Sequence, residues 1–75
     1  MMTIGEALDA MKVGARVARQ GWNGRGMYLR LVRPKDPLYG PFVEMWTAQG
    51  QFVPWLCSQT DLLAEDWVRV EVSDG

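Results

Sequence analysis

Hydrophobic residues near the N-terminus recur at the spacing of an amphipathic helix. Intervals of three and four residues place four of them on one side of such a helix: Ile4, Ala7, Leu8 and Met11. Thr3 and Glu6 have the spacing of a capping box just before this run, and Gly14 follows it as a typical stop signal. The pattern therefore predicts a helix from Ile4 to Lys12.

Alternation of hydrophobic and polar residues, which is typical of strands, replaces this spacing after the helix. It predicts strands over residues 15–22, 27–33, 42–48, 51–55 and 68–72. Asn23-Gly24 predicts a two-residue hairpin turn between the first two strands, and Gln49-Gly50 predicts another between the third and fourth. Pro54 indicates that the fourth strand is short or lies at a sheet edge.

Two further segments complete the predicted order of elements. Residues 34–41 form a loop punctuated by Pro and Gly, and Ser58-Gln59-Thr60-Asp61 is a second capping-box candidate that opens a short helix through Ala64. The order is then α-β-β-β-β-α-β. We expect an α+β fold with residues 1–75 as a single domain: a small antiparallel sheet, an N-terminal helix and a short second helix before the last strand.

The composition excludes several kinds of site. The chain has 75 residues, one cysteine (Cys57) and no histidine. A disulfide within the chain is therefore impossible, and zinc sites built from Cys and His, Ser-His catalysis and Cys-His catalysis are all excluded. A single cysteine suits a reducing cytoplasm, and no run resembles a signal peptide or a membrane span. We expect a cytoplasmic protein with no metal, no cofactor and no membrane contact.

The charges are unevenly distributed although the formal net charge is only −1. Seven of the eight Lys and Arg residues lie within residues 12–35, a stretch that contains no acid. Two interpretations remain open: a local anion site, or a solvated basic face balanced by acids elsewhere in the fold. A nearly neutral protein of this kind is not expected to bind a nucleic-acid polymer.

The segment RQGWNGRG, residues 19–26, combines groups that recognise nucleotides. Trp22 abuts the predicted turn, and a flat ring there can stack on a nucleobase. Arginines stand on both sides of it and can meet phosphates with paired donors. Gly24 and Gly26 allow backbone amides to approach an anion closely. The alternative is that Trp22 and Trp55 are core or subunit-interface residues.

A second loop leads from Trp55 to the predicted start of the short helix at Ser58, where phosphate or polar groups are favoured. Asp61 follows within the first turn, either as a capping residue, as a catalytic acid or as a hydrogen-bond acceptor for a ligand. Glu65 and Asp66 are adjacent, so on a helix they point in different directions and do not form an acid/base pair. We interpret them as a solvated helix end. No convincing nucleophile is present, and we expect a protein that is not an enzyme.

Four runs of the sequence resemble the phage and prophage family of Thoeris anti-defence proteins. They are GEAL (5–8), VARQGWNG (17–24), GMYL (26–29) and VPWLCSQTDLLAEDW (53–67), and they cover nearly the whole chain. In Thoeris defence a TIR-domain enzyme makes a cyclic ADP-ribose isomer that activates a killing effector. The resemblance implies a homotetramer in the host bacterial cytoplasm that binds this signal, glyco-cyclic ADP-ribose, between subunits without cleaving it. Some relatives also sequester the cyclic oligonucleotides of CBASS defence.

The resemblance also implies a set of ligand contacts. Trp22 and Asn23 match the family's turn, where Trp22 is expected to contact the adenine. Trp55 and the run from Ser58 to Asp61 match its second loop, and the phosphate role of Arg25 and Gly26 is inferred from chemistry and position. The full set is Trp22, Asn23, Gly24, Arg25, Gly26, Trp55, Ser58, Gln59, Thr60 and Asp61.

Two departures from the family and two other functions stay open. The loop 34–41 is shorter than in many relatives, and Trp46 stands where many relatives carry a polar or basic residue, which points to a subunit contact or a changed ligand preference. The protein could instead be a sponge chiefly for cyclic di- or trinucleotides. A third function is inhibition of a host protein through a tryptophan-rich surface.

Overall fold

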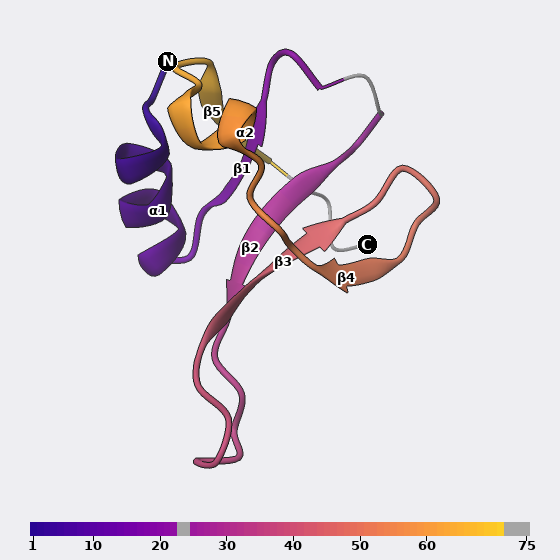
Figure 1. Cartoon of the computed structure of the whole chain (residues 1–75). Coiled ribbons are helices and arrows are strands. Elements are labelled where there is room, and N and C mark those ends of the chain that lie inside the picture. The colour runs from indigo at the N-terminus through magenta and orange to yellow at the C-terminus, as the bar shows by residue number, and fades with distance from the viewer. Residues whose placement is uncertain (23–24, 72–75) are drawn as a thin grey trace.

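The secondary-structure elements follow one another in the order that the pattern predicts. The structure is a computed structural model that describes residues 1–22 and 25–71. The elements are α1 (Ile4–Lys12), β1 (Arg16–Arg19), β2 (Tyr28–Val32), β3 (Phe42–Trp46), β4 (Phe52–Pro54), α2 (Gln59–Leu63) and β5 (Trp67–Val70) (Figure 1). The predicted α+β class and the order α-β-β-β-β-α-β are confirmed. No helix in the described ranges is long and apolar enough to cross a membrane.

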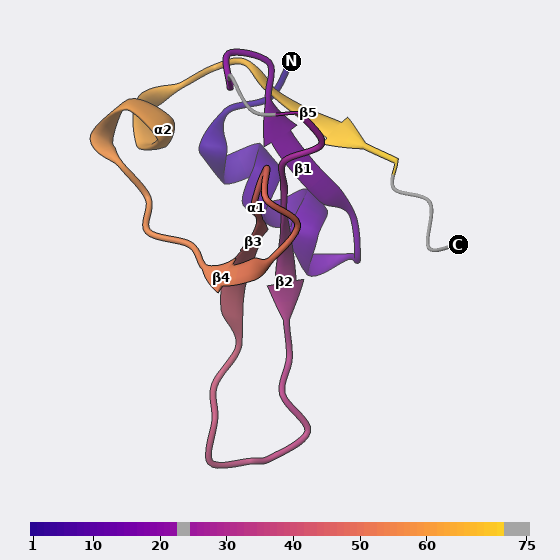
Figure 2. The ribbon, with the colours of Figure 1, turned by 90° about the vertical axis from the view of Figure 1, so that its right-hand side faces the viewer.

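The five strands form one antiparallel sheet in the order β4-β3-β2-β1-β5. The short strand β4, which contains Pro54, lies at one edge as predicted, and β5 lies at the other. The chain from β4 to β5 must therefore pass from one edge of the sheet to the other, and it carries α2 on the way (Figure 2). This crossing places α2 near the start of β5 and the end of β1.

Local signals at both ends explain the bounds of α1. The backbone N–H of Thr3 donates to Glu6 at 3.0 Å and that of Glu6 donates to the Thr3 hydroxyl at 3.3 Å, so the predicted capping box is formed. At the other end Gly14 adopts a φ of 96°, a left-handed conformation that glycine tolerates without strain. The N–H groups of Gly14 and Ala15 then donate to carbonyls of the last turn at 3.0 Å each, the pattern of a Schellman motif.

One face of the sheet packs against α1 and forms the core. The buried residues of this core are Ala7, Ala10, Met11, Val17, Leu29 and Trp67. Trp67 is the largest of them and has no exposed surface. Leu29 pairs with Val17 on β1 and with Met45 on β3, so these residues share the core face.

The opposite face of the sheet carries three neighbouring aromatic side chains, which we call the aromatic face: Tyr28, Trp46 and Phe52. Tyr28 and Trp46 stack with ring centroids 6.3 Å apart, and Trp46 and Phe52 lie 4.7 Å apart. Their strand register places them opposite one another on β2, β3 and β4. In the described part of the chain no helix packs on this face.

Two turns are longer than the two-residue hairpins that the sequence predicts. β1 ends at Arg19 and β2 begins at Tyr28, so the first connection comprises residues 20–27. Its first residues bond to Asp66 before β5 instead of pairing with β2, and Asn23-Gly24 lies outside the described residues. The second connection is a three-residue loop, 48–50, closed by a bond from the Thr47 N–H to the Gln51 carbonyl at 2.9 Å. Gly50, at a φ of 81°, supplies the left-handed position there.

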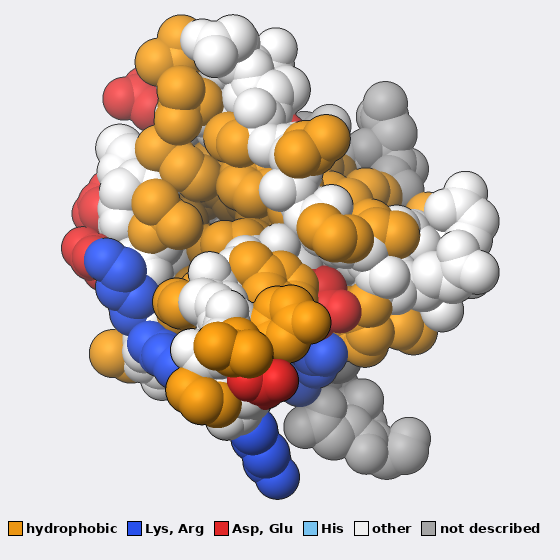
Figure 3. All heavy atoms as spheres, turned by 60° about the horizontal axis from the view of Figure 1, so that its bottom comes forward, with side chains coloured by type: hydrophobic (Ala, Val, Ile, Leu, Met, Phe, Trp, Pro, Cys, Tyr) orange, Lys and Arg blue, Asp and Glu red, His pale blue; other side chains and the backbone are white. Residues whose placement is uncertain are grey.

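The loop between β2 and β3 extends away from the rest of the molecule (Figure 2). Leu38 and Tyr39 in this loop are 88% and 67% exposed. When the loop is turned toward the viewer, hydrophobic side chains spread across much of the visible surface, and Lys and Arg side chains gather toward one side (Figure 3). This side of the molecule therefore exposes hydrophobic side chains to solvent, and its positive charges are unevenly distributed.

Candidate functional site

The two predicted ligand loops meet around the buried indole of Trp67. The Trp22 ring packs edge-to-face on Trp67 with centroids 5.4 Å apart, and the Trp55 ring does the same at 5.9 Å. Both outer rings are half-buried and pack against the hydrophobic core. Edge-to-face contacts of this kind add about 0.5–1.5 kcal/mol beyond the area that they bury. Residues more than thirty positions apart are thus brought into one tryptophan cluster.

Asp61 joins this cluster to the first loop. Its Oδ1 accepts a hydrogen bond from Trp22 Nε1 at 3.2 Å and another from Arg19 Nη1 at 2.9 Å. The Asp61 backbone N–H donates to the Ser58 hydroxyl at 3.1 Å, which is the first half of the predicted capping box. The second half is not formed, because the Asp61 carboxylate turns to Arg19 and Trp22. The capping role predicted for Asp61 is therefore formed only through its backbone N–H and not through its carboxylate.

Asp66 is the other acceptor of Arg19. Arg19 Nε donates to Asp66 Oδ1 at 2.7 Å, and the Gly21 N–H donates to Asp66 Oδ2 at 2.9 Å. The Gln20 N–H donates to the Asp66 backbone carbonyl at 3.1 Å. The interpretation of Asp66 as part of a solvated helix end is therefore wrong: α2 ends at Leu63, and Asp66 holds the start of the first loop.

The ion pairs with Arg19 lower the pKa of both carboxyl groups. Hydrogen bonding from Arg19 is the main cause that lowers the pKa of Asp66, with a further contribution from the Gly21 N–H. Burial raises the pKa of Asp61, but hydrogen bonds from Arg19, Trp22 and Ser58 outweigh it, and the net pKa is lowered. The same two carboxylates raise the pKa of Arg19, chiefly through its bond to Asp66. All three groups are therefore charged at neutral pH.

The guanidinium donors of Arg19 are therefore occupied by carboxylates of the protein itself. Its side chain is 17% exposed and donates to two carboxylates, so it is not the phosphate-binding arginine that the sequence suggested on that side of Trp22. Arg30 is paired as well, with Glu44 at 3.1 Å. Acids from outside residues 12–35 thus balance part of the basic stretch, in line with the second interpretation of the charge pattern. Arg25 is exposed and stands at the far end of the first loop.

The remaining predicted residues lie at the surface beside the cluster. Gly26, at a φ of 71°, is exposed, and so are Ser58, Gln59 and Thr60 at the start of α2. Because α2 has only five residues and its first turn is capped by its own Ser58, its terminus adds little attraction for a phosphate. The predicted Asn23 and Gly24 contacts fall outside the described residues.

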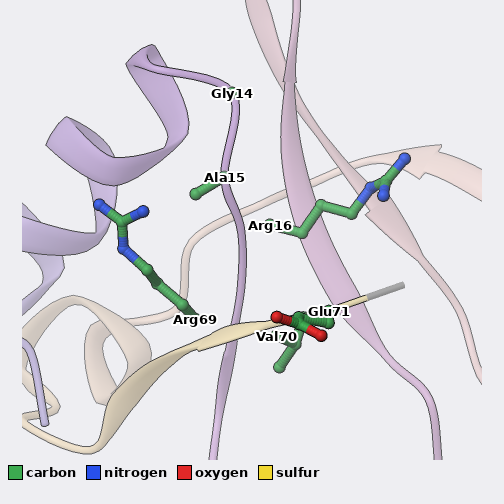
Figure 4. A pocket seen from close by; sticks show the side chains of 6 residues that line it. All are labelled: Gly14, Ala15, Arg16, Arg69, Val70 and Glu71. Carbon is green, nitrogen blue, oxygen red and sulfur yellow. The ribbon is translucent and has the colours of Figure 1, made fainter. Parts of the chain in front are cut away.

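A hollow of about 530 Å³ lies elsewhere, between the end of α1 and the edge strand β5. It is lined by Gly14, Ala15, Arg16, Arg69, Val70 and Glu71 (Figure 4). The side chains of Arg16 and Arg69 point away from each other, and Arg16 lies over the Tyr28 ring at 5.5 Å (Figure 4). The two cations do not converge on a common point, so this hollow is a poor candidate for an anion site.

Two residues that organise the site, Arg19 and Asp66, were not predicted to do so. One signal in the sequence was available for Arg19. It stands two residues after Val17 on a strand, and therefore faces the core side, where an arginine needs an acidic partner. The sequence does not reveal which acids supply that partner, because Asp61 and Asp66 are 42 and 47 positions away.

Comparison with known proteins gives two matches. The family model described as Tad2-like, the Thoeris anti-defense 2-like domain, matches residues 2–70. A curated protein of Bacillus phage SP01 named Thoeris anti-defense 2 is 37% identical over an alignment 81 positions long, which covers 88% of this chain and 91% of that protein. The family match spans the tryptophan cluster and the two loops that meet there.

Proposed function

The chain belongs to the Tad2-like family of Thoeris anti-defence domains, and from this premise we propose that it blocks Thoeris defence by binding a cyclic ADP-ribose-type signal without cleaving it. The membership confirms the resemblance found in the sequence. The signal that we propose is glyco-cyclic ADP-ribose. The single observation that best supports a binding role is the convergence of Trp22, Trp55 and Asp61 around Trp67.

The cluster suits the adenine half of such a signal. Trp22 and Trp55 are both half-buried, so each ring keeps some surface for a planar base while its other contacts hold it in place. The Trp22 N–H is already bonded to Asp61, so we assign the ring face, not the N–H, to the base. Stacking of one base contributes roughly 1–3 kcal/mol.

The phosphates and riboses require polar groups beside the rings. Arg25 is exposed, and the backbone of Gly26 lies next to it without a side chain to block approach. Gln59 and Thr60 present side chains on the other loop. Charge-assisted hydrogen bonds of this type contribute about 1.5–3 kcal/mol each. Asp61 is assigned to holding the rings and not to the ligand, because Arg19 and Trp22 already occupy its Oδ1.

Tight binding also requires more enclosure than these exposed groups provide. A nanomolar dissociation constant corresponds to about −12 kcal/mol, which exceeds one stacked base and two phosphate contacts together. We propose that copies of the chain supply the remainder by self-association, as a homotetramer. The aromatic face supports this, since Phe52 on it is 38% exposed and no described helix packs there.

Thermal melting against a panel of small molecules tests the proposal. The panel contains glyco-cyclic ADP-ribose, other cyclic ADP-ribose isomers and cyclic di- and trinucleotides. A one-site ligand at 100 times its dissociation constant stabilises the folded state by about 2.7 kcal/mol, which is a readable shift in Tm for a small domain. The bound molecule is then released by heating and analysed by mass spectrometry. A Tm shift with intact ligand supports the binding role.

The same experiment separates the proposal from its alternatives. Larger shifts with cyclic di- or trinucleotides than with cyclic ADP-ribose isomers would favour a CBASS-directed sponge. Recovery of a cleaved product would contradict the non-enzymatic role. No shift with any member of the panel would overturn signal binding and favour inhibition of a host protein.

A further inference from the structure

Arg19 connects the two loops of the candidate site through Asp61 and Asp66, and these bonds occupy the donors that the sequence suggested for a phosphate. We propose that Arg19 is a positioning residue for ligand binding: by holding Asp61 and Asp66 together, it fixes the orientation in which the Trp22 ring receives the base. This inference rests on the proposed function, because it concerns how the same site reaches its affinity. In this inference the ion pairs of Arg19 with Asp61 and Asp66 preorganise the site and do not contact the signal.

The first step in the argument is the placement of Arg19 in the sheet. It is the last residue of β1 and lies directly opposite Trp67 on β5, so its side chain leaves the strand beside the central indole of the cluster. Its side chain is 17% exposed. The guanidinium is planar and presents donors in a fixed fork, so its orientation determines where two acceptors must lie.

The second step is that the two acceptors, Asp61 and Asp66, come from the segment that leads from α2 into β5. Asp61 lies within α2, whereas Asp66 lies between α2 and β5. Arg19 donates to Asp61 through Nη1 at 2.9 Å and to Asp66 through Nε at 2.7 Å. The side chains of Asp61 and Asp66 are 14% and 27% exposed, so without the guanidinium two poorly hydrated carboxylates would repel each other. Arg19 therefore sets where α2 lies relative to β1.

The third step links that position to Trp22. The indole is held at two points: its N–H bonds to Asp61 at 3.2 Å, and its ring meets Trp67 edge-on at an interplanar angle of 81°. Its backbone is held as well, because the preceding Gly21 N–H bonds to Asp66 at 2.9 Å. A Cβ at Gly21 would lie 3.0 Å from Asp66 Oδ2, which shows how closely the loop and the carboxylate approach. Displacement of either carboxylate thus releases a restraint on the ring.

A released ring binds a base less tightly because its side-chain freedom is lost on binding instead of on folding. Ordering one such side chain, together with the loop that carries it, corresponds to a loss of about tenfold in affinity. The expected defect of an Arg19 variant is therefore partial. Removal of a group that touches the signal directly, by contrast, is expected to cost more.

The test measures affinity and ring orientation in the same variants. Wild type, Arg19→Gln, Arg19→Lys and Asp66→Asn are titrated with glyco-cyclic ADP-ribose by calorimetry, and the indole N–H resonance of Trp22 is followed by NMR without ligand. That resonance is assigned by its loss in Trp22→Phe. Arg33→Gln is the matched control, because Arg33 is an exposed arginine that bonds to the Lys12 carbonyl at 3.1 Å and not to the cluster.

We expect Arg19→Gln to weaken binding about tenfold and to shift the Trp22 resonance, with Asp66→Asn giving a smaller change in the same direction. Arg19→Lys should rescue only in part, because an ammonium keeps the charge but lacks the fixed fork. Arg33→Gln should match wild type in both measurements. If Arg19→Gln does not fold, the affinity and resonance of Asp66→Asn decide the question.

Three outcomes would overturn the inference. The first is wild-type affinity in folded Arg19→Gln or, where that variant is unfolded, in Asp66→Asn. The second is weakened binding with an unmoved Trp22 resonance, which would indicate that Arg19 contacts the signal. The third is full rescue by Arg19→Lys, which would reduce its role to charge alone. These outcomes leave the proposed function intact, whereas absence of binding by wild type overturns that function and this inference with it.

Discussion

The indole Nε1–H of Trp22 donates to Asp61 Oδ1 across 3.2 Å, and this bond joins the two loops that carry the predicted ligand contacts. The same oxygen accepts from Arg19 at 2.9 Å. Because the acceptor is a carboxylate, the bond is charge-assisted and roughly twice as strong as one between neutral groups. The orientation of the Trp22 ring is thereby coupled to the position of α2.

Replacement of Trp22 by Phe should lower the free energy of unfolding by about 1–2 kcal/mol. The variant keeps a ring against Trp67 but removes the N–H, so Asp61 loses one of its donors. Urea unfolding followed by circular dichroism measures the change. Thr60→Ala is a suitable control, since Thr60 is exposed and should leave stability within about 0.5 kcal/mol of wild type.

Replacement of Trp22 by Ala should abolish binding of glyco-cyclic ADP-ribose, because the variant removes the ring face that we assign to the base. The half-buried ring contributes to packing, so the variant should be less stable than wild type but still folded. Calorimetric titration and the circular dichroism spectrum together check this prediction. A variant that has lost its native spectrum would favour the alternative in which Trp22 is a core residue.

Trp55 and Trp67 should respond differently to truncation although their rings touch. Trp67 has no exposed surface, and its replacement by Ala should cost about 3–5 kcal/mol, most of the stability of a domain this small. Trp55→Ala should remain folded and lose affinity for the signal, because Trp55 lies at the rim of the cluster. Thermal melts followed by titration of the folded variant distinguish the two. Equal stability of both variants would contradict the assignment of Trp67 as the centre of the core.

Acid should destabilise the protein through the carboxylates of Asp61 and Asp66. The pKa of each is lowered in the folded state, so their contribution is complete above the unfolded value of about 3.9 and is lost as the pH falls through the lower folded values. The Tm should therefore fall steeply below about pH 4. The double variant Asp61→Asn/Asp66→Asn should start from a lower Tm at pH 7 and show a shallower decline. A parallel decline in both proteins would assign the effect to other acids, such as Glu6, whose pKa is also lowered.

The helix α1 could be predicted to the residue because its determinants are local. Thr3, Glu6 and Gly14 lie within one turn of its ends and form the bonds that their spacing predicts. The order of the strands along the chain could likewise be predicted, because alternation of hydrophobic and polar residues is a local pattern. The first turn could not be predicted, because the chain there bonds to Asp66, which lies more than forty positions away.

Three residues of the candidate site could be picked out from the sequence, but their bonding could not. Trp22, Trp55 and Asp61 stand out by chemical type, and the structure brings them together. The sequence could not show that Arg19 is consumed by two carboxylates, since its partners are set by how α2 crosses the sheet. An arginine beside an aromatic ring has the same appearance in the sequence whether it binds a phosphate or an aspartate.

The aromatic face is the surface through which we expect copies of the chain to associate. Trp46 lies at its centre, between Tyr28 at 6.3 Å and Phe52 at 4.7 Å. A charge placed there has to be desolvated when a second copy packs on the face, so Trp46→Glu should shift the protein from the proposed tetramer to smaller species. Light scattering coupled to gel filtration measures the mass.

Leu38→Glu is the matched control for this variant. Leu38 is a large hydrophobic residue that is 88% exposed, but it lies on the projecting loop between β2 and β3 and away from the aromatic face. It should leave the mass unchanged. If Trp46→Glu is a tetramer as stable as wild type, the aromatic face is not the interface. If wild type is itself a monomer, enclosure by a second copy cannot account for tight binding, and the signal must be held by the tryptophan cluster of one chain alone.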